Sequence, residues 1–172
     1  MTVPASEFSR LVPLVRIGRD KHREPIEANA VEREALARRL DLVALDRLSA
    51  VVTLWREADG EIVLEAAWEA EFVQNCVASL EPVAGAASDA FVLRYGPEAA
   101  TGRLLLLGPD EPDFEPLAGE AVDVGEAVAQ ELSLSLPAFP RHPDAPADAS
   151  LEAERAQPPF AVLSSLRPPG DS

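Results

Sequence analysis

Chemically reactive side chains are scarce in this chain, which has one cysteine, Cys76, and two histidines, His22 and His142. A cysteine acts as a nucleophile when a neighbouring base or positive charge favours its thiolate. A zinc site takes about four clustered cysteine, histidine or carboxylate ligands. The two histidines stand far from Cys76 in the sequence and share no ligand spacing with it. The sequence therefore predicts no metal and no cofactor.

The surroundings of Cys76 indicate packing rather than catalysis. An alternating apolar segment precedes it and Val77 follows it, which favours a partly buried and unreactive thiol. The alternative is a Cys76-dependent enzyme or redox protein, although no base stands nearby in the sequence. We therefore expect a protein that is not an enzyme.

A second group of reactive side chains is a set of glutamates at alternating positions. Paired carboxylates serve in acid–base catalysis, but here apolar residues occupy the intervening even positions from Ile62 to Phe72. A period of two is typical of a β-strand with one buried and one solvated face. The pattern therefore predicts that the carboxylates belong to a wet strand face, at Glu61, Glu65, Glu69 and Glu71.

A short basic cluster is the best candidate for touching RNA phosphates. It falls in a predicted loop, and a few positive charges give only modest phosphate affinity. The alternative is an ordinary solvated loop, because Asp20 and Glu24 partly neutralise it. The candidate RNA contacts are Arg16, Arg19, Lys21 and Arg23.

The overall charge opposes generic binding to nucleic acid. The 172 residues include 15 Lys and Arg against 30 Asp and Glu, a net charge of −15. Residues 1–60 carry ten basic and ten acidic side chains, whereas residues 61–172 carry five and twenty. An acidic half of this kind favours a basic protein partner, with plain solubility as the alternative.

The chain carries no sign of export or of membrane insertion. One cysteine cannot form an intramolecular disulfide. The first residues lack the charged start and apolar run of a secretory signal, and the longest apolar runs are a few residues. We expect a cytoplasmic protein that does not span a membrane.

Apolar periodicity and turn signals predict an α+β fold. An antiparallel sheet of about five to six strands is accompanied by two main helices, one near the N-terminus and one that closes the fold. Asp59-Gly60 marks the turn of the clearest hairpin. The expected strands are residues 11–17 at a sheet edge, 48–55, 61–72, 89–95 and 103–107.

The two predicted helices have clear start signals. Asn29 and Glu32 form a capping box for a helix over residues 30–40, whose apolar stripe is Val31, Ala35, Leu36 and Leu40. Asp123 caps the second helix, with Glu126 completing another capping box, and Pro137 ends it. Its stripe is Val124, Val128, Leu132 and Leu136. Residues 108–119 are predicted to be a mobile loop, and the proline-rich residues after 136 a disordered tail.

Three segments carry a resemblance to a known family. They are residues 74–82, which read QNCVASLEP, the motif DVGE at residues 123–126, and PAFPRHP at residues 137–143. Together they resemble the YceD family, a bacterial domain named for large ribosomal RNA subunit accumulation. The resemblance covers about residues 8–143, which we take as one α+β domain followed by a tail over residues 144–172.

The resemblance implies a non-enzymatic factor that supports 23S ribosomal RNA accumulation and large-subunit biogenesis through protein binding, ribosomal RNA binding or both. It implies as partners a basic ribosomal protein or assembly factor, with RNA contact inside pre-ribosomal particles. Relatives often have Cys-x-x-Cys where this chain has Cys76 and Ser79, so the missing second cysteine favours a structural turn here. The matching motif positions are Gln74, Cys76, Leu80, Glu81, Pro82, Asp123, Gly125 and Glu126.

Overall fold

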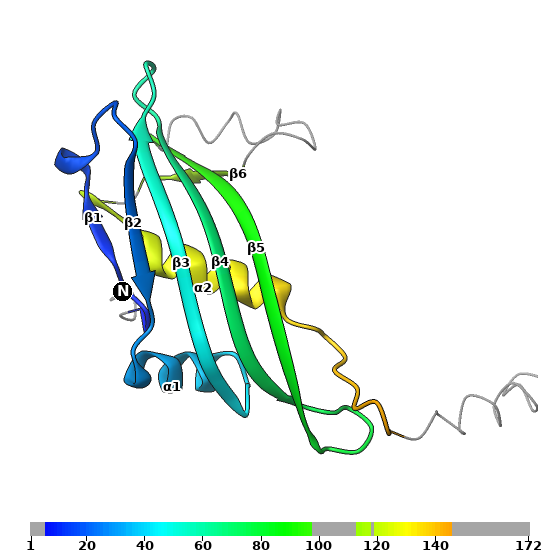
Figure 1. Cartoon of the computed structure of the whole chain (residues 1–172). Helices are drawn as coiled ribbons and strands as arrows, with labels where there is room; N and C mark the ends of the chain where they lie inside the picture. Colours follow the sequence, from blue (N-terminus) through cyan, green and yellow to red (C-terminus); the bar gives the residue numbers. More distant parts are fainter. Residues whose placement is uncertain (1–5, 98–112, 118, 146–172) are drawn as a thin grey trace, which may run out of the picture.

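A long twisted sheet with a helix across one face forms the core of the protein (Figure 1). The computed structural model describes residues 6–97, 113–117 and 119–145. Five strands lie in the order β2-β3-β4-β5-β6, and a separate pair joins β1 to β7. All neighbours are antiparallel except β5 and β6, which are parallel. The predicted α+β class with a mostly antiparallel sheet is confirmed.

The central hairpin joins β3 (Ala44–Arg56) to β4 (Ile62–Asn75). Gly60 adopts a φ of 92° in the connecting turn, and Asp59 Oδ1 accepts the Glu61 N–H at 3.1 Å. As predicted, the even positions of both strands are buried and Glu65, Glu69 and Glu71 are exposed. The expectation for Glu61 is wrong, because this carboxylate is only 7% exposed and pairs with Arg94 at 3.4 Å.

The second hairpin extends the sheet from β4 to β5 (Pro82–Gly96). The strand is longer than the predicted segment 89–95, because it begins directly after the Leu80-Glu81 turn. Leu93 and Tyr95 are buried on the core face and Phe91 is partly buried, as the alternation predicts. Only the last residues of β5 pair with β6 (Asp113–Pro116).

The N-terminal part differs from the sequence prediction. The expected strand 11–17 is a three-residue β1 (Leu11–Pro13) followed by a 3-10 turn, η1 (Leu14–Arg16). The basic cluster is not confined to a loop, because β2 (His22–Glu27) pairs with β3 along its whole length. Alternation is weak in β2, since only Ile26 is buried, and this explains why the sequence did not reveal the strand.

Helix α1 (Ala30–Arg39) packs at one end of the sheet. Its capping box is confirmed, since Asn29 accepts the Val31 and Glu32 N–H groups and Glu32 accepts the Asn29 N–H. The predicted apolar stripe is only partly right. Val31 is 74% exposed, whereas Leu36 and Ala37 are the buried residues, so the helix covers the sheet with a narrow face.

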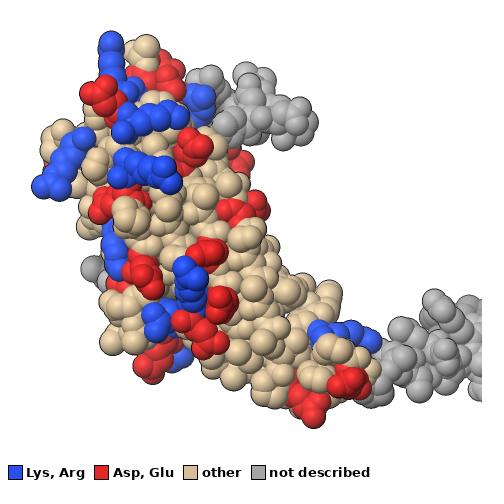
Figure 2. Space-filling view, viewed as in Figure 1, with Lys and Arg blue, Asp and Glu red and all other residues tan. Residues whose placement is uncertain are grey.

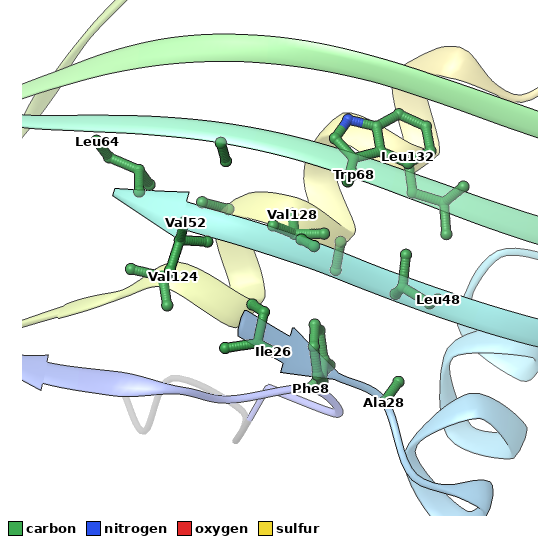
Figure 3. Packing of buried hydrophobic residues seen from close by; sticks show 14 of the residues in the cluster. Phe8, Ile26, Ala28, Leu48, Val52, Leu64, Trp68, Val124, Val128 and Leu132 are labelled. Carbon is green, nitrogen blue, oxygen red and sulfur yellow. The ribbon is translucent and has the colours of Figure 1, made fainter. Parts of the chain in front are cut away.

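Helix α2 (Val124–Ser135) lies across the sheet and closes the core (Figure 3). Val124, Val128 and Leu132 are fully buried against β3 and β4, as predicted, and Leu136 packs at the rim. Asp123 caps the helix, but the expected second capping box is absent. The Glu126 carboxylate pairs instead with Arg39 of α1 at 2.7 Å.

The stretch predicted to be a mobile loop contains ordered strands. Residues 113–116 form β6, and β7 (Ala121–Asp123) pairs with β1 immediately before α2. The acidic, proline-bearing composition misled the prediction, since both strands are too short to alternate. The expected strand 103–107 and most of the tail 144–172 lie outside the described residues. No helix in the described ranges is long and apolar enough to cross a membrane.

Candidate functional site

The Cys76 loop (residues 76–81) closes the hairpin between β4 and β5. The Cys76 N–H donates to the Glu81 carbonyl at 2.8 Å, and the Leu80 N–H donates to the Cys76 carbonyl at 2.9 Å. Leu80 adopts a φ of 62° and its side chain is 76% exposed. A branched aliphatic residue in this conformation is uncommon and carries strain. The turn is therefore tightly constrained, although Leu80 fills no core position.

Three backbone N–H groups converge on the sulfur of Cys76. Those of Ala78 and Ser79 lie 3.4 Å from Sγ, and that of His142 lies 3.3 Å away. The His142 N–H, followed by contacts with Ser79, lowers the pKa of the Cys76 thiol to about 6. Donors of this kind favour the thiolate over the thiol. Cys76 is fully buried, more than predicted, and its sulfur is polarised rather than surrounded by apolar atoms.

The chain that follows α2 docks against this loop. The Val77 N–H donates to the Pro140 carbonyl at 2.9 Å, and Gln74 Nε2 donates to the Pro137 carbonyl at 3.3 Å. The contact between His142 and Cys76 runs through the backbone N–H, while the imidazole Nδ1 accepts the Asp144 N–H at 3.2 Å. Residues 137–142 thus have defined partners, which corrects the expectation of disorder from Pro137 onward.

This docking also explains the spacing of two sequence motifs. Cys76 and His142 stand far apart in the sequence, and the sequence prediction treated them as unrelated. The structure brings them together because α2 runs back along the sheet and delivers its C-terminal end to the β4–β5 turn. Proline carbonyls cannot be paired by their own segment, so the loop N–H groups satisfy them.

The remaining motif positions lie at the opposite end of α2. Asp123 Oδ1 accepts the N–H groups of Gly125, Glu126 and Arg10 at 3.2, 3.2 and 2.7 Å. A Cβ on Gly125 would lie 2.3 Å from the Phe8 carbonyl oxygen, so only glycine fits there. Asp123, Gly125 and Glu126 therefore fix the N-terminal segment and are not assembled with Gln74, Cys76, Glu81 and Pro82 into one site.

Glu126 joins three parts of the chain through its carboxylate. It accepts from Arg39 of α1, from Ser6 and from Gln130. These bonds, above all the one from Arg39, lower the pKa of Glu126 to about 2. The arrangement is a clamp between the two helices, with no open position for a substrate.

The basic cluster gathers at the end of the sheet where β2 begins and β3 turns into β4. Figure 2 shows Lys and Arg side chains crowded at this end of the molecule, with acidic residues among them. Arg16 ends η1, Arg19 lies in the turn before β2, and Arg23 belongs to β2. Lys21 Nζ stands 4.0 Å from the ring centroid of Trp55 and 3.5 Å from Glu65. The structure therefore brings the four candidate residues to one end of the sheet.

The sheet face opposite α2 is open and slightly hollow. We call this the open face, and Figures 1 and 2 view it directly. A depression of about 580 Å³ runs over β2, β3 and β4 among small side chains such as Ser49, Val51 and Ala67. Arg47 and Glu69 pair within it at 2.6 Å. Sequence analysis named this face only as solvated glutamates and missed its uncharged centre, which shows in the alternate small residues of β3 and β4.

Metal and paired-acid chemistry find no assembled group in the residues that the structure describes. No set of three or more His, Cys, Asp or Glu side chains there is placed to hold a metal ion. Burial of the sulfur under backbone N–H groups makes Cys76 an acceptor in a turn. What the described part offers is binding surface: a basic end, an open face and an acidic side.

Comparison with known proteins gives one match. A family model described as large ribosomal RNA subunit accumulation protein YceD matches residues 64–167. The match begins in β4, so it takes in the Cys76 loop, β5, β6 and α2. No curated protein and no solved structure matches the chain.

Proposed function

The chain belongs to the YceD family, and on that basis we propose that it is a non-enzymatic binding factor that supports accumulation of 23S ribosomal RNA. The family description carries the proposal, since it names a role in accumulation of the large-subunit RNA. The described architecture supports it by offering exposed surfaces rather than an enclosed reaction site. The factor acts on the large ribosomal subunit during its biogenesis, in the bacterial cytoplasm.

The basic end of the sheet is proposed to contact ribosomal RNA. Arg16, Arg19 and Arg23 are exposed, and within the described residues none of them makes an ion pair. Unpaired guanidinium groups are free to hold phosphate oxygens in a bidentate fashion. Lys21 is less available, because Trp55 and Glu65 hold its ammonium group.

Such a small patch fits contact inside a particle rather than capture of free RNA. Three or four phosphate contacts give modest affinity that falls as salt rises. The net charge of −15 further repels RNA at long range. The acidic part of the chain is proposed to supply the second attachment, to a basic ribosomal protein or assembly factor. Two weak attachments on one particle reinforce each other.

A rescue experiment tests this division. A strain depleted of the native protein receives a variant with Arg16, Arg19 and Arg23 changed to Gln. The control changes Arg33, Arg38 and Arg47 to Gln, which removes the same charge from the far end of the sheet and from α1. The first variant should lower the ratio of 23S to 16S RNA and shift the protein off pre-ribosomal fractions in gradients, while the control should rescue. Equal behaviour of the two variants at equal protein levels would contradict an RNA contact at the basic end.

The rival proposal is chemistry that depends on Cys76. The lowered pKa of the thiol favours it, because a thiolate is the reactive form. Full burial of the side chain and the absence of an imidazole contact from His142 among the printed distances to Sγ oppose it. Cys76→Ser decides between the two proposals, since a binding factor should still rescue. Loss of rescue with an unchanged unfolding midpoint would favour the enzyme or redox reading.

A further inference from the structure

The outer edge of β5 is a long strand edge without a partner in the described residues. From Pro82 to Val92 the strand pairs only with β4. Its other edge meets β6 only over Leu93–Gly96. A run of about nine residues spans about 30 Å, enough for an added strand of ordinary length.

The backbone groups that face this edge can be assigned. The Gly96 carbonyl accepts the Leu117 N–H on the β6 side at 2.8 Å. The Ala90 N–H donates to Asp89 Oδ1 at 2.8 Å instead of to the ladder with β4. The register of β4 and β5 has no bulge, so every second residue shares this direction. The even-numbered residues of β5 therefore present their N–H and C=O groups outward.

The edge lacks the usual protection against strand addition. Natural sheet edges are blocked by lysines, prolines, bulges or very short strands. Here the outward-facing residues carry small, exposed side chains, and the one proline stands at the start of the strand. Figure 2 shows uncharged atoms over most of this side of the open face. The small residues are Ala84, Ala86, Ser88 and Ala90.

Acidic side chains flank the same edge on its α2 side. Asp89 of β5, Asp113 and Glu115 of β6, and Glu131 of α2 lie close enough to repel one another. Burial, followed by these neighbours, raises the pKa of both Glu115 and Glu131. Within the described residues none of the four forms an ion pair. The edge therefore carries uncompensated negative charge.

We propose that the β5 edge binds an extended cationic segment of a partner protein, which adds to the sheet as a further strand. Backbone hydrogen bonds to the even-numbered residues supply the register, and lysine or arginine side chains lie against Asp89 and Glu131. The inference goes beyond the proposed function, because it names the chemistry of the partner and the surface that takes it. It can hold or fail on purified protein whatever the rescue experiment shows.

Charge decides against two other occupants of this edge. A second copy paired edge to edge would bring two sets of the same acidic residues together. Residues 146–172 of the chain itself carry two arginines against four acidic residues, Asp148, Glu152, Glu154 and Asp171, so they are also repelled. A cationic segment from another protein is the occupant that the charges favour.

The test uses the full chain and a fluorescent nine-residue peptide of alternating lysine and valine. Fluorescence anisotropy measures its dissociation constant, and amide hydrogen exchange of β5 locates it. Binding should weaken with salt, and the amides of Ala86 and Ser88 should become protected. A peptide with glutamate in place of lysine, and one with a central proline, should bind at least about tenfold more weakly.

Two protein variants separate strand addition from simple charge attraction. Ala86→Pro removes an outward N–H and leaves the ladder with β4 intact, so it should weaken binding about tenfold. Ala58→Pro is the matched control, since it falls in the β3–β4 turn, where the Gly60 N–H donates to the Glu57 carbonyl. Asp89→Asn with Glu131→Gln removes two charges at the edge, and Glu34→Gln with Asp41→Asn removes two elsewhere.

The outcomes divide cleanly. Protection of β5 amides together with weaker binding by both edge variants supports the proposal. Absence of peptide binding overturns it, and so does binding that protects no β5 amide or that both edge variants retain. If Ala86→Pro lowers the unfolding midpoint, the charge variants and the exchange data on the native protein still decide.

Discussion

Loss of the Glu126 clamp should destabilise the fold in a way that depends on pH. Glu126 joins α2 to Arg39 of α1 and to Ser6, and its pKa lies near 2 instead of the ordinary 4.5. A depression of that size corresponds to at most about 3.4 kcal/mol, at about 1.36 kcal/mol per pH unit. The side chains of Glu126 and Arg39 are 23% and 34% exposed, so water screens the pair. We expect Glu126→Gln to cost about 1–2 kcal/mol at pH 7.

The sign of the pH effect follows from the direction of the shift. A carboxylate with a depressed pKa contributes its stabilisation fully above the unfolded value of about 4.5 and loses it as the pH falls toward the folded value of about 2. The free-energy difference between the native protein and Glu126→Gln should therefore be constant from pH 7 to pH 5. It should shrink steadily from pH 4.5 to pH 2.

Urea unfolding at a series of pH values measures this difference. Glu34→Gln is the control, because its pair with Arg38 at 2.7 Å is about 70% exposed on both sides. That pair should contribute less than about 0.5 kcal/mol at any pH. Equal and pH-independent losses for Glu126→Gln and Glu34→Gln would refute the reasoning, since the clamp would then be an ordinary surface pair.

Three further predictions concern the core, the helix start and the thiol. Trp68→Asp should cost more than about 3 kcal/mol, because Trp68 is 3% exposed beneath α2, whereas Glu69→Gln on the wet face should stay within about 0.5 kcal/mol; urea midpoints that fall together would contradict the face assignment. Gly125→Ala should cost about 1–3 kcal/mol, because its Cβ would meet the Phe8 carbonyl, whereas Gly18→Ala has nothing within 4 Å and should be neutral in the same measurement. The thiolate absorbance of Cys76 near 240 nm should titrate with a midpoint about pH 6 in the folded protein; a midpoint at its ordinary value of about 9 would show that the three N–H groups do not hold the sulfur.

Local patterns in the sequence were sufficient where a segment has one buried and one wet face. The β3–β4 hairpin, the Asp59-Gly60 turn and the stripe of α2 follow from periods of two and 3.6 residues, because burial of alternate side chains selects those spacings. Asn29 and Asp123 were found as helix caps, since capping depends on neighbours within three residues. Glu61 escaped the same argument, because its burial depends on Arg94 across the sheet.

The strands that the sequence missed are short or lie at edges. β2 buries one side chain, and β6 and β7 contain four and three residues, so no periodic signal exists for them. They are strands because a neighbour supplies their hydrogen-bond partners. Glu126 likewise left its expected capping box because Arg39, distant in the sequence, offers a stronger ion pair.

The sequence by itself determined the fold class, the family and the acidic balance, because each depends on residue types and local order alone. Only the tertiary structure decided where His142 meets Cys76, which strand edge stays open, and which acidic side chains gather beside it. Those relations join residues that the chain separates by tens of positions. They arise from the direction in which α2 and β6 return across the sheet, and no local pattern encodes that direction.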